Sequence, residues 1–170
     1  YLPLRYFEKK EIVPSAVDRF LRKTTLQGFV HDESAAFQGG ISGNAGLFST
    51  AREVGKVYQM LLNGGELDGR RYLSKETCAL FTTDKSKISR RGLGFDKPDV
   101  VNEGKSPCAV SAPASVYGHT GFTGTSIYVD NKTGVYVVLL TNRVHPSRED
   151  NRIIAFRRHF HNMVFASLEE

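Results

Sequence analysis

Apolar and polar positions follow a strand-like pattern in the last third of this chain. Two runs of β-branched and aromatic residues, Ser126–Val129 and Val135–Leu140, are separated by the turn-forming segment Asn131–Gly134. This pattern predicts a β-hairpin. In the second run residues on both faces are apolar, which predicts a strand sandwiched between two layers.

Upstream of this hairpin, apolar residues recur with the period of an α-helix. Thr50 and Glu53 have the spacing of a capping box, and Asn63-Gly64-Gly65 is expected to end the helix in the left-handed conformation. The apolar residues between them recur at the spacing of one buried face: Val54, Val57, Tyr58, Leu61 and Leu62.

Two further helices are predicted. Ser74 is expected to cap a short helix that reaches about Phe81, after a tight turn at Asp68-Gly69. The segment from Ser147 to about Leu168 is expected to form the last helix. Its predicted buried stripe is Ile153, Phe156, Phe160 and Val164.

Together these elements predict an α+β fold in which an antiparallel sheet is flanked by helices. The C-terminal helix would cover one face of the sheet, and the helical region of residues 50–81 the other. Residues 1–38 contain the breakers Pro3 and Pro14 and are expected to wrap over the rest as loop and short strand. A length of 170 residues is within the range of one ordinary domain.

Composition and charge limit the function classes. Hydrophobic content of 40% and charged content of 24% are ordinary for a globular protein, and no apolar run approaches the ~20 residues of a membrane helix. The net charge is +5, but the arginine pairs Arg70-Arg71, Arg90-Arg91 and Arg157-Arg158 have no interleaved aromatic residues. We therefore expect no nucleic-acid partner and interpret the pairs as solvated.

Neither cysteines nor histidines suggest a metal or an organic cofactor. Cys78 and Cys108 are expected to be free thiols, with a disulfide as the alternative. Three consecutive side chains such as those of His31-Asp32-Glu33 rarely converge on one ion. His159 and His161 point in different directions on a helix, so a surface role is expected for both.

The candidate chemistry lies in His119-Thr120-Gly121-Phe122-Thr123-Gly124-Thr125, which directly precedes the hairpin. We interpret it as a Gly-rich, polar strand start. Glycines let a substrate approach the main chain closely. A main-chain N–H at such an edge can stabilise an oxyanion.

This segment resembles the third active-site motif of the serine β-lactamase and penicillin-binding-protein superfamily. The histidine form is similar to the branch that holds class C β-lactamases, D-Ala-D-Ala peptidases and related esterases. The run Gly39–Ala51 resembles the family's Gly-rich entry into a helix, and the segment Arg91–Phe95 resembles its strand before the third motif, in the same order. The resemblance covers roughly residues 28–160 and implies a partial β-lactamase/transpeptidase-like fold.

The resemblance also implies roles for individual residues. His119, Thr120 and Gly121 would be the catalytic-site residues: His119 to bind a substrate carboxylate or tune the proton network, Thr120 to offer a hydroxyl, and Gly121 to leave a bare surface. The alternative for His119 is a strand-edge histidine bonded to a neighbour. The residues implied to bind substrate are Phe122 through its main-chain N–H, Asn142 at the end of the next strand, and Asn44 and Ala45 in a pocket-lining loop. Asn142 as a strand-end cap and residues 44–45 as plain loop are the alternatives.

Two motifs of the family are absent from this sequence. No serine has lysine three places on, and no tyrosine has asparagine two places on. The Ser-x-Asn match Ser42-Gly43-Asn44 is better explained as a polar Gly-rich loop. We therefore expect residues 1–170 to be the C-terminal portion of a β-lactamase-like domain, inactive alone because it lacks the activated serine.

Two functions stay open on this basis. One is part of a serine hydrolase acting by acyl transfer on a β-lactam, a D-Ala-D-Ala peptide or a small ester. The other is a non-catalytic binding or packing module. Expected partners are a substrate with a carboxylate or acyl group, the missing N-terminal part of the fold, and a second copy through an exposed sheet edge. The resemblance further implies a periplasmic or extracellular location, and similar segments can follow a family 3 glycoside hydrolase domain.

Overall fold

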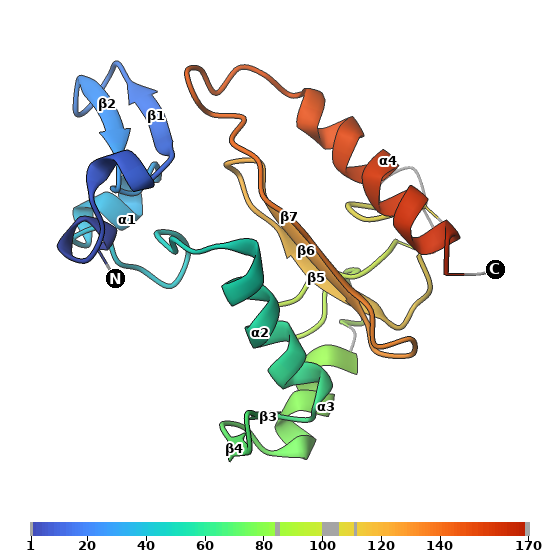
Figure 1. The fold of residues 1–170 in the computed structure, drawn as a ribbon. Coiled ribbons are helices and arrows are strands. Elements are labelled where there is room, and N and C mark those ends of the chain that lie inside the picture. Colours follow the sequence, from blue (N-terminus) through green and yellow to red (C-terminus); the bar gives the residue numbers. More distant parts are fainter. Residues whose placement is uncertain (1, 84–85, 100–105, 111, 169–170) are drawn as a thin grey trace. The chain divides into compact units, whose positions relative to one another are not determined.

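The computed structural model of this chain describes residues 2–83, 86–99, 106–110 and 112–168. The chain divides into two compact units, which are described separately (Figure 1). The first comprises Tyr1–Thr50 and Thr141–Asn151, and the second comprises Ala51–Leu140 and Arg152–Glu170.

The first unit has more regular structure than the sequence predicts. Its elements are the 3-10 helices η1 (Pro3–Arg5) and η2 (Lys9–Glu11), the antiparallel strands β1 (Pro14–Asp18) and β2 (Thr24–Gln27), and the helix α1 (Glu33–Phe37). The Asp18 carboxylate closes the β1–β2 turn by accepting the N–H groups of Phe20 and Leu21. Such a local side-chain contact explains how a segment with weak apolar periodicity forms a hairpin.

The helices of the second unit follow the sequence closely. Helix α2 spans Ala51–Leu62 and ends at two glycines with positive φ, Gly64 (+64°) and Gly65 (+93°), as predicted. Asp68-Gly69 turns between the two-residue strands β3 (Glu66–Leu67) and β4 (Arg70–Arg71).

Helix α3 also confirms the prediction for its start. It spans Lys75–Thr83, and the hydroxyl of Ser74 accepts the N–H of Thr77 at 3.1 Å. The side-chain cap satisfies one of the N–H groups that the first turn of a helix leaves without a partner.

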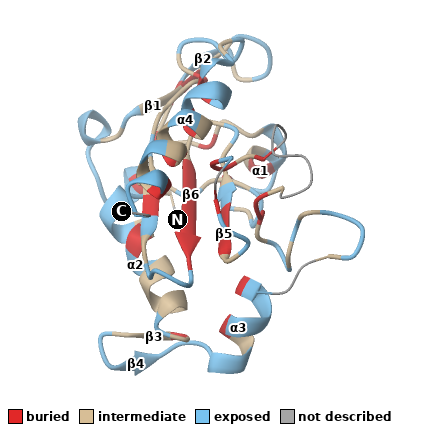
Figure 2. Ribbon diagram, turned by 90° about the vertical axis from the view of Figure 1, so that its right-hand side faces the viewer, coloured by how far each residue is buried: buried red, intermediate tan, exposed pale blue. Residues whose placement is uncertain are grey.

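A three-stranded antiparallel sheet forms the centre of this unit. Its strands are β5 (Val116–Thr120), β6 (Ser126–Asp130) and β7 (Tyr136–Leu139), in the order β5-β6-β7. The hairpin prediction is confirmed. However, the central strand β6 is the one buried along its whole length (Figure 2), whereas Tyr136 on β7 is 37% exposed.

Helices cover both faces of this sheet, as the α+β prediction requires. On one face α2 contributes Val54, Tyr58, Leu61 and Leu62, which pack against Tyr117, Ile127 and Val129 of β5 and β6. On the other face Phe165 of α4 (Arg152–Ala166) packs in one cluster with Val116 and Tyr128. Figure 1 shows α2 and α4 on opposite sides of the strands.

Three details of the sequence prediction are wrong. Helix α4 begins at Arg152 rather than Ser147. Its buried positions are Ile153, Arg157, His161 and Phe165, so Ile153 alone of the predicted stripe is buried. Phe156 of that stripe is 50% exposed, and Val57 of α2 is also exposed. Polar residues could take the buried positions of α4 because each has a hydrogen-bond acceptor or donor inside the unit.

The segment Arg91–Phe95 is also not the expected strand. The residues that follow it contact the sheet at a single bridge, Asp96 to Gly118, made by two main-chain hydrogen bonds of 2.7 and 2.9 Å. Phe95 instead packs edge-on against Tyr117, with ring centroids 5.0 Å apart.

Candidate functional site

The His119-Thr120-Gly121 segment spans a strand end and the turn that follows. His119 and Thr120 are the last residues of β5, and β6 begins at Ser126. The predicted strand start is therefore a tight connection between two paired strands. The connection is closed by the Gly121 N–H, which donates to the Thr125 carbonyl at 2.7 Å, and by the Gly124 N–H, which donates to the Gly121 carbonyl at 3.1 Å.

Side chains alternate across the sheet, so His119 and Thr120 lie on opposite faces. His119 pairs with Ile127 and shares the face of Tyr117, which α2 covers. Thr120 pairs with Ser126 on the face of α4. His119 is exposed, and Thr120 is half-buried.

Gly121 lies close to the side chain of Thr125. A Cβ atom at position 121 would lie 2.2 Å from the Thr125 hydroxyl, so that side chain would have to rotate to accept a larger residue. The predicted role of Gly121 as a bare surface for substrate stays a prediction. Phe122 is 61% exposed, and the role of its main-chain N–H as an oxyanion donor also stays a prediction.

The ring of His119 has a polar contact at each nitrogen. Its Nε2 lies 2.8 Å from Nη1 of Arg91, and its Nδ1 lies 2.7 Å from the Thr120 carbonyl oxygen. The structure therefore realises the alternative of a strand-edge histidine bonded to neighbours. That finding is compatible with a role in substrate binding, because the residue remains open to solvent.

The buried carboxylate of Asp96 lies close to Arg91. Asp96 is 2% exposed and accepts two hydrogen bonds from Arg90, from Nε at 2.7 Å and from Nη2 at 3.0 Å. Nη2 of Arg91 lies 3.7 Å from the same carboxylate. The hydrogen bond to Asp96 raises the pKa of Arg90.

This cluster corrects the interpretation of Arg90-Arg91 as a solvated pair. Sequence reasoning did not place Arg91 or Asp96 in the site, since residues 91 and 119 are far apart along the chain. The available signal was that Arg91 begins the segment Arg91–Phe95, which resembles the part of the family that precedes the third motif.

On the α4 face, buried polar residues adjoin the same connection. The Ser126 hydroxyl lies 3.0 Å from Nε2 of His161, and Nη2 of Arg157 donates to the Gly121 carbonyl at 3.3 Å. His161 is fully buried, so the expectation of a surface role was wrong for this residue. Burial, followed by the charge of Arg157, lowers the pKa of His161 to about 4.

The remaining predicted residues lie in the first unit. The amide nitrogen of Asn142 donates to the carbonyl of Pro14, the first residue of β1. Nδ2 of Asn44 donates to Asp32 at 3.2 Å, and Oδ1 of Asn44 accepts from Ser42 at 2.7 Å. The side chain of Asn44 thus supports the residue that caps α1, and substrate roles for Asn44, Ala45 and Asn142 stay predictions.

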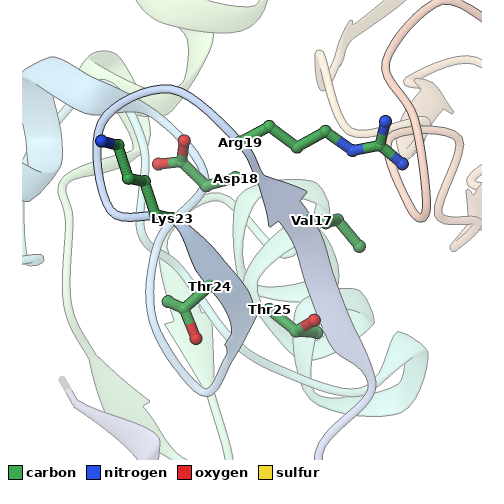
Figure 3. Close-up of a pocket in the computed structure, with 6 residues that line it drawn as sticks. All are labelled: Val17, Asp18, Arg19, Lys23, Thr24 and Thr25. Carbon is green, nitrogen blue, oxygen red and sulfur yellow. The ribbon is translucent and has the colours of Figure 1, made fainter.

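A shallow depression of about 450 Å³ lies on the β1–β2 hairpin of the first unit (Figure 3). It is lined by Val17, Asp18, Arg19, Lys23, Thr24 and Thr25. The side chain of Arg22, through its hydrogen bond, holds the pKa of Asp18 well below its usual range. Because this carboxylate is already engaged and none of the predicted site residues lines the depression, we assign it no function.

Over the described ranges, no group of three or more His, Cys, Asp or Glu side chains is arranged to hold a metal ion. Helices long and apolar enough to cross a membrane are also absent from the part of the chain that the structure describes. Cys78 and Cys108 are both buried and free, and burial raises the pKa of the Cys108 thiol to about 12.

Comparison with known proteins shows which family the sequence matches. The profile of the family described as Beta-lactamase matches residues 11–161, which is most of the chain. The chain is also similar to a protein of Escherichia coli (strain K12) named "Putative D-alanyl-D-alanine carboxypeptidase", with 36% identity over 126 residues. Proteins of the same name from Salmonella agona (strain SL483) and Salmonella typhi are 38% identical over 127 residues. Each match covers 74% of this chain and 29% of the relative, so the chain spans under a third of these proteins.

Proposed function

Because this chain belongs to the Beta-lactamase family, we propose that it carries the third active-site motif of a serine hydrolase that acts by acyl transfer. The observation that carries the proposal is the placement of His119-Thr120-Gly121. The segment lies at the solvent-open end of β5, and its turn is fixed by main-chain hydrogen bonds. A rigid strand end of this kind can hold a substrate beside a nucleophile supplied by another segment.

The nucleophile is the part that this sequence does not contain. We propose that a Ser-x-x-Lys and a Tyr-x-Asn segment of the same protein complete the site and its sheet. The relatives support a site shared between this chain and other segments of the same protein, since the matched segment is 29% of their length. The natural protein would form a covalent serine ester and then hydrolyse it.

For the substrate, we propose a D-Ala-D-Ala peptide first, followed by a β-lactam or a small ester. The support is the name carried by the relatives from Escherichia coli and Salmonella, which refers to D-alanyl-D-alanine carboxypeptidases. Such a peptide presents both an acyl group and a terminal carboxylate. Action on it would place the protein in the periplasm or outside the cell.

Two samples test this proposal. The 170-residue chain alone should not hydrolyse a chromogenic β-lactam, p-nitrophenyl acetate or a D-Ala-D-Ala peptide above a heat-denatured control. The natural protein should hydrolyse at least one of them and should be labelled covalently by a fluorescent penicillin. Turnover by the chain alone that is lost on substitution of one of its own serines would reject the division of the site.

A second candidate function is a non-catalytic binding module. The absence of both earlier motifs from this sequence favours it. The natural protein distinguishes the two readings: if it contains neither motif and is not labelled by penicillin, the binding module is correct and the hydrolase is not.

We also propose that the chain alone self-associates through β7. Among the described residues β7 pairs with β6 only, which leaves its outer edge as a template for another strand. Sedimentation at low micromolar concentration should show a dimer or larger species, and a clean monomer would reject this.

A further inference from the structure

The contacts of His119 define the position of its ring proton. A guanidinium has only hydrogen-bond donors, and a carbonyl oxygen only accepts. Nε2, which lies 2.8 Å from Nη1 of Arg91, must therefore be the acceptor. Nδ1, which lies 2.7 Å from the Thr120 carbonyl, must be the donor. Both bonds form together in one state only, the neutral imidazole with its hydrogen on Nδ1.

The guanidinium of Arg91, which favours this state, also contacts a buried carboxylate. Its Nη2 lies 3.7 Å from the carboxylate of Asp96, which is buried and bonded twice by Arg90. The main chain of Asp96 is bonded in both directions to Gly118, the residue that precedes His119 on β5. Asp96, which contacts Arg91, is therefore bonded to the residue next to His119 on β5.

We propose that Arg91 is a positioning residue for His119, which it holds as the neutral Nδ1–H tautomer. The consequence for catalysis depends on the proposed function. In that site the imidazole would contribute orientation rather than charge, and it could take up a proton only after Arg91 releases Nε2. Of the two roles that the resemblance implies for His119, a neutral ring favours tuning of the proton network over binding of a substrate carboxylate.

The contact is suited to orientation more than to folding. Arg91 is 46% exposed in its side chain and His119 is open to solvent, and exposed polar pairs contribute little to stability. Substitution of Arg91 should therefore leave the fold intact and change the ring of His119 alone.

The test is a measurement of the tautomer by long-range ¹H–¹⁵N correlation on the chain labelled at histidine, at pH 8. The signals of His119 are assigned by their loss in His119→Gln. In the unsubstituted chain Nδ1 should carry the hydrogen. In Arg91→Ala the share of the Nε2–H form, which free imidazole side chains favour, should rise, and the contact of Nδ1 with the Thr120 carbonyl should limit this rise. Arg91→Lys should retain much of the Nδ1–H form, because an ammonium also only donates.

Arg70→Ala is the matched control, since it removes an exposed arginine that lies over the ring of Tyr72. It should leave the His119 signals unchanged. A predominant Nε2–H form in the unsubstituted chain would overturn the proposal, and so would a tautomer ratio in Arg91→Ala equal to that of the unsubstituted chain. The readout does not involve turnover. A natural protein without hydrolase activity would therefore refute the proposed function without affecting the tautomer result.

Discussion

The two faces of the β5-β6-β7 sheet are covered in different ways. The α2 face is a cluster of aromatic and aliphatic groups. The ring centroid of Tyr117 lies 5.0 Å from that of Phe95 and 6.4 Å from that of Tyr58. The α4 face contains apolar residues as well, but it also buries Ser126, Arg157 and His161. Both helices pack on the same three strands, so the difference lies in the side chains and not in the topology.

The buried polar residues of the α4 face lie next to the candidate site. The buried polar groups of the α4 face contact the Gly121 carbonyl and the first residue of β6, on either side of the connection that carries the motif. Hydrogen bonds have a fixed geometry, whereas apolar contacts tolerate small displacements. We infer that the α2 face mainly provides stability and that the α4 face fixes the shape of the motif.

The largest expected effect is on the α2 face. Tyr117→Ala removes a fully buried ring from the aromatic cluster and should lower the free energy of unfolding by about 3–5 kcal/mol. Urea denaturation measures this change. Tyr72→Ala, at a residue that is 54% exposed, is the control and should change stability by much less. Equal losses in the two variants would contradict the burial of Tyr117.

The α4 face should give the chain a pH dependence. Burial lowers the pKa of His161 from 6.5 to about 4 in the folded chain. Between these values the unfolded chain binds a proton that the folded chain does not, so stability falls as the pH falls from 6.5 to 4. The total loss from this group is about 3 kcal/mol.

The measurement is the free energy of unfolding against pH. His161→Gln should remove this part of the dependence, because its side chain does not titrate. His159→Gln, at an exposed position of the same helix, is the control and should keep the profile of the unsubstituted chain. Identical profiles for His161→Gln and the unsubstituted chain would show that His161 is not buried in its neutral form.

Ser126→Ala should have a smaller effect. It removes the hydrogen-bond partner of His161 Nε2 and should lower stability by about 1–3 kcal/mol. In a double-mutant cycle with His161→Gln, the two losses should not add, because the residues contact each other. Strict additivity would mean that the hydroxyl and the ring do not interact.

The smallest effect is expected for Tyr117→Phe. The hydroxyl of Tyr117 is buried and has no hydrogen-bond partner in the part of the chain that the structure describes. Removal of an unpaired buried hydroxyl should leave stability within about 1 kcal/mol of its original value or raise it. A loss comparable to that of Tyr117→Ala would show that the hydroxyl, and not the ring, is what this face requires.

The same contrast explains what the sequence could predict of the fold. Helix α2 was predicted well because Val54, Tyr58 and Leu61 are apolar and recur with the helical period. The buried side of α4 was misassigned because Arg157 and His161 look like surface residues until their partners are known. Strand β5 was not predicted as a strand because Gly118 and His119 interrupt its apolar pattern.

At the candidate site, contacts between residues that are far apart in the sequence could not be predicted. The local motif His119-Thr120-Gly121 could be found directly from its residue types. The contact of Arg91 with His119 could not, because it depends on how Asp96 pairs with Gly118 across the sheet edge. Asn44 and Asn142 were proposed from the family pattern alone, and their side chains have hydrogen-bond partners within the first unit.

The most direct test of the central claim is the effect of His119→Ala on kcat/KM of the natural protein with its preferred acyl substrate. A positioned polar group that acts in the transition state contributes about 10²-fold or more. We therefore expect a loss of about 10²-fold with an unchanged circular dichroism spectrum, and a smaller loss for Thr120→Ala. Wild-type kcat/KM in the folded His119→Ala protein would contradict the assignment of this strand end as the third active-site motif.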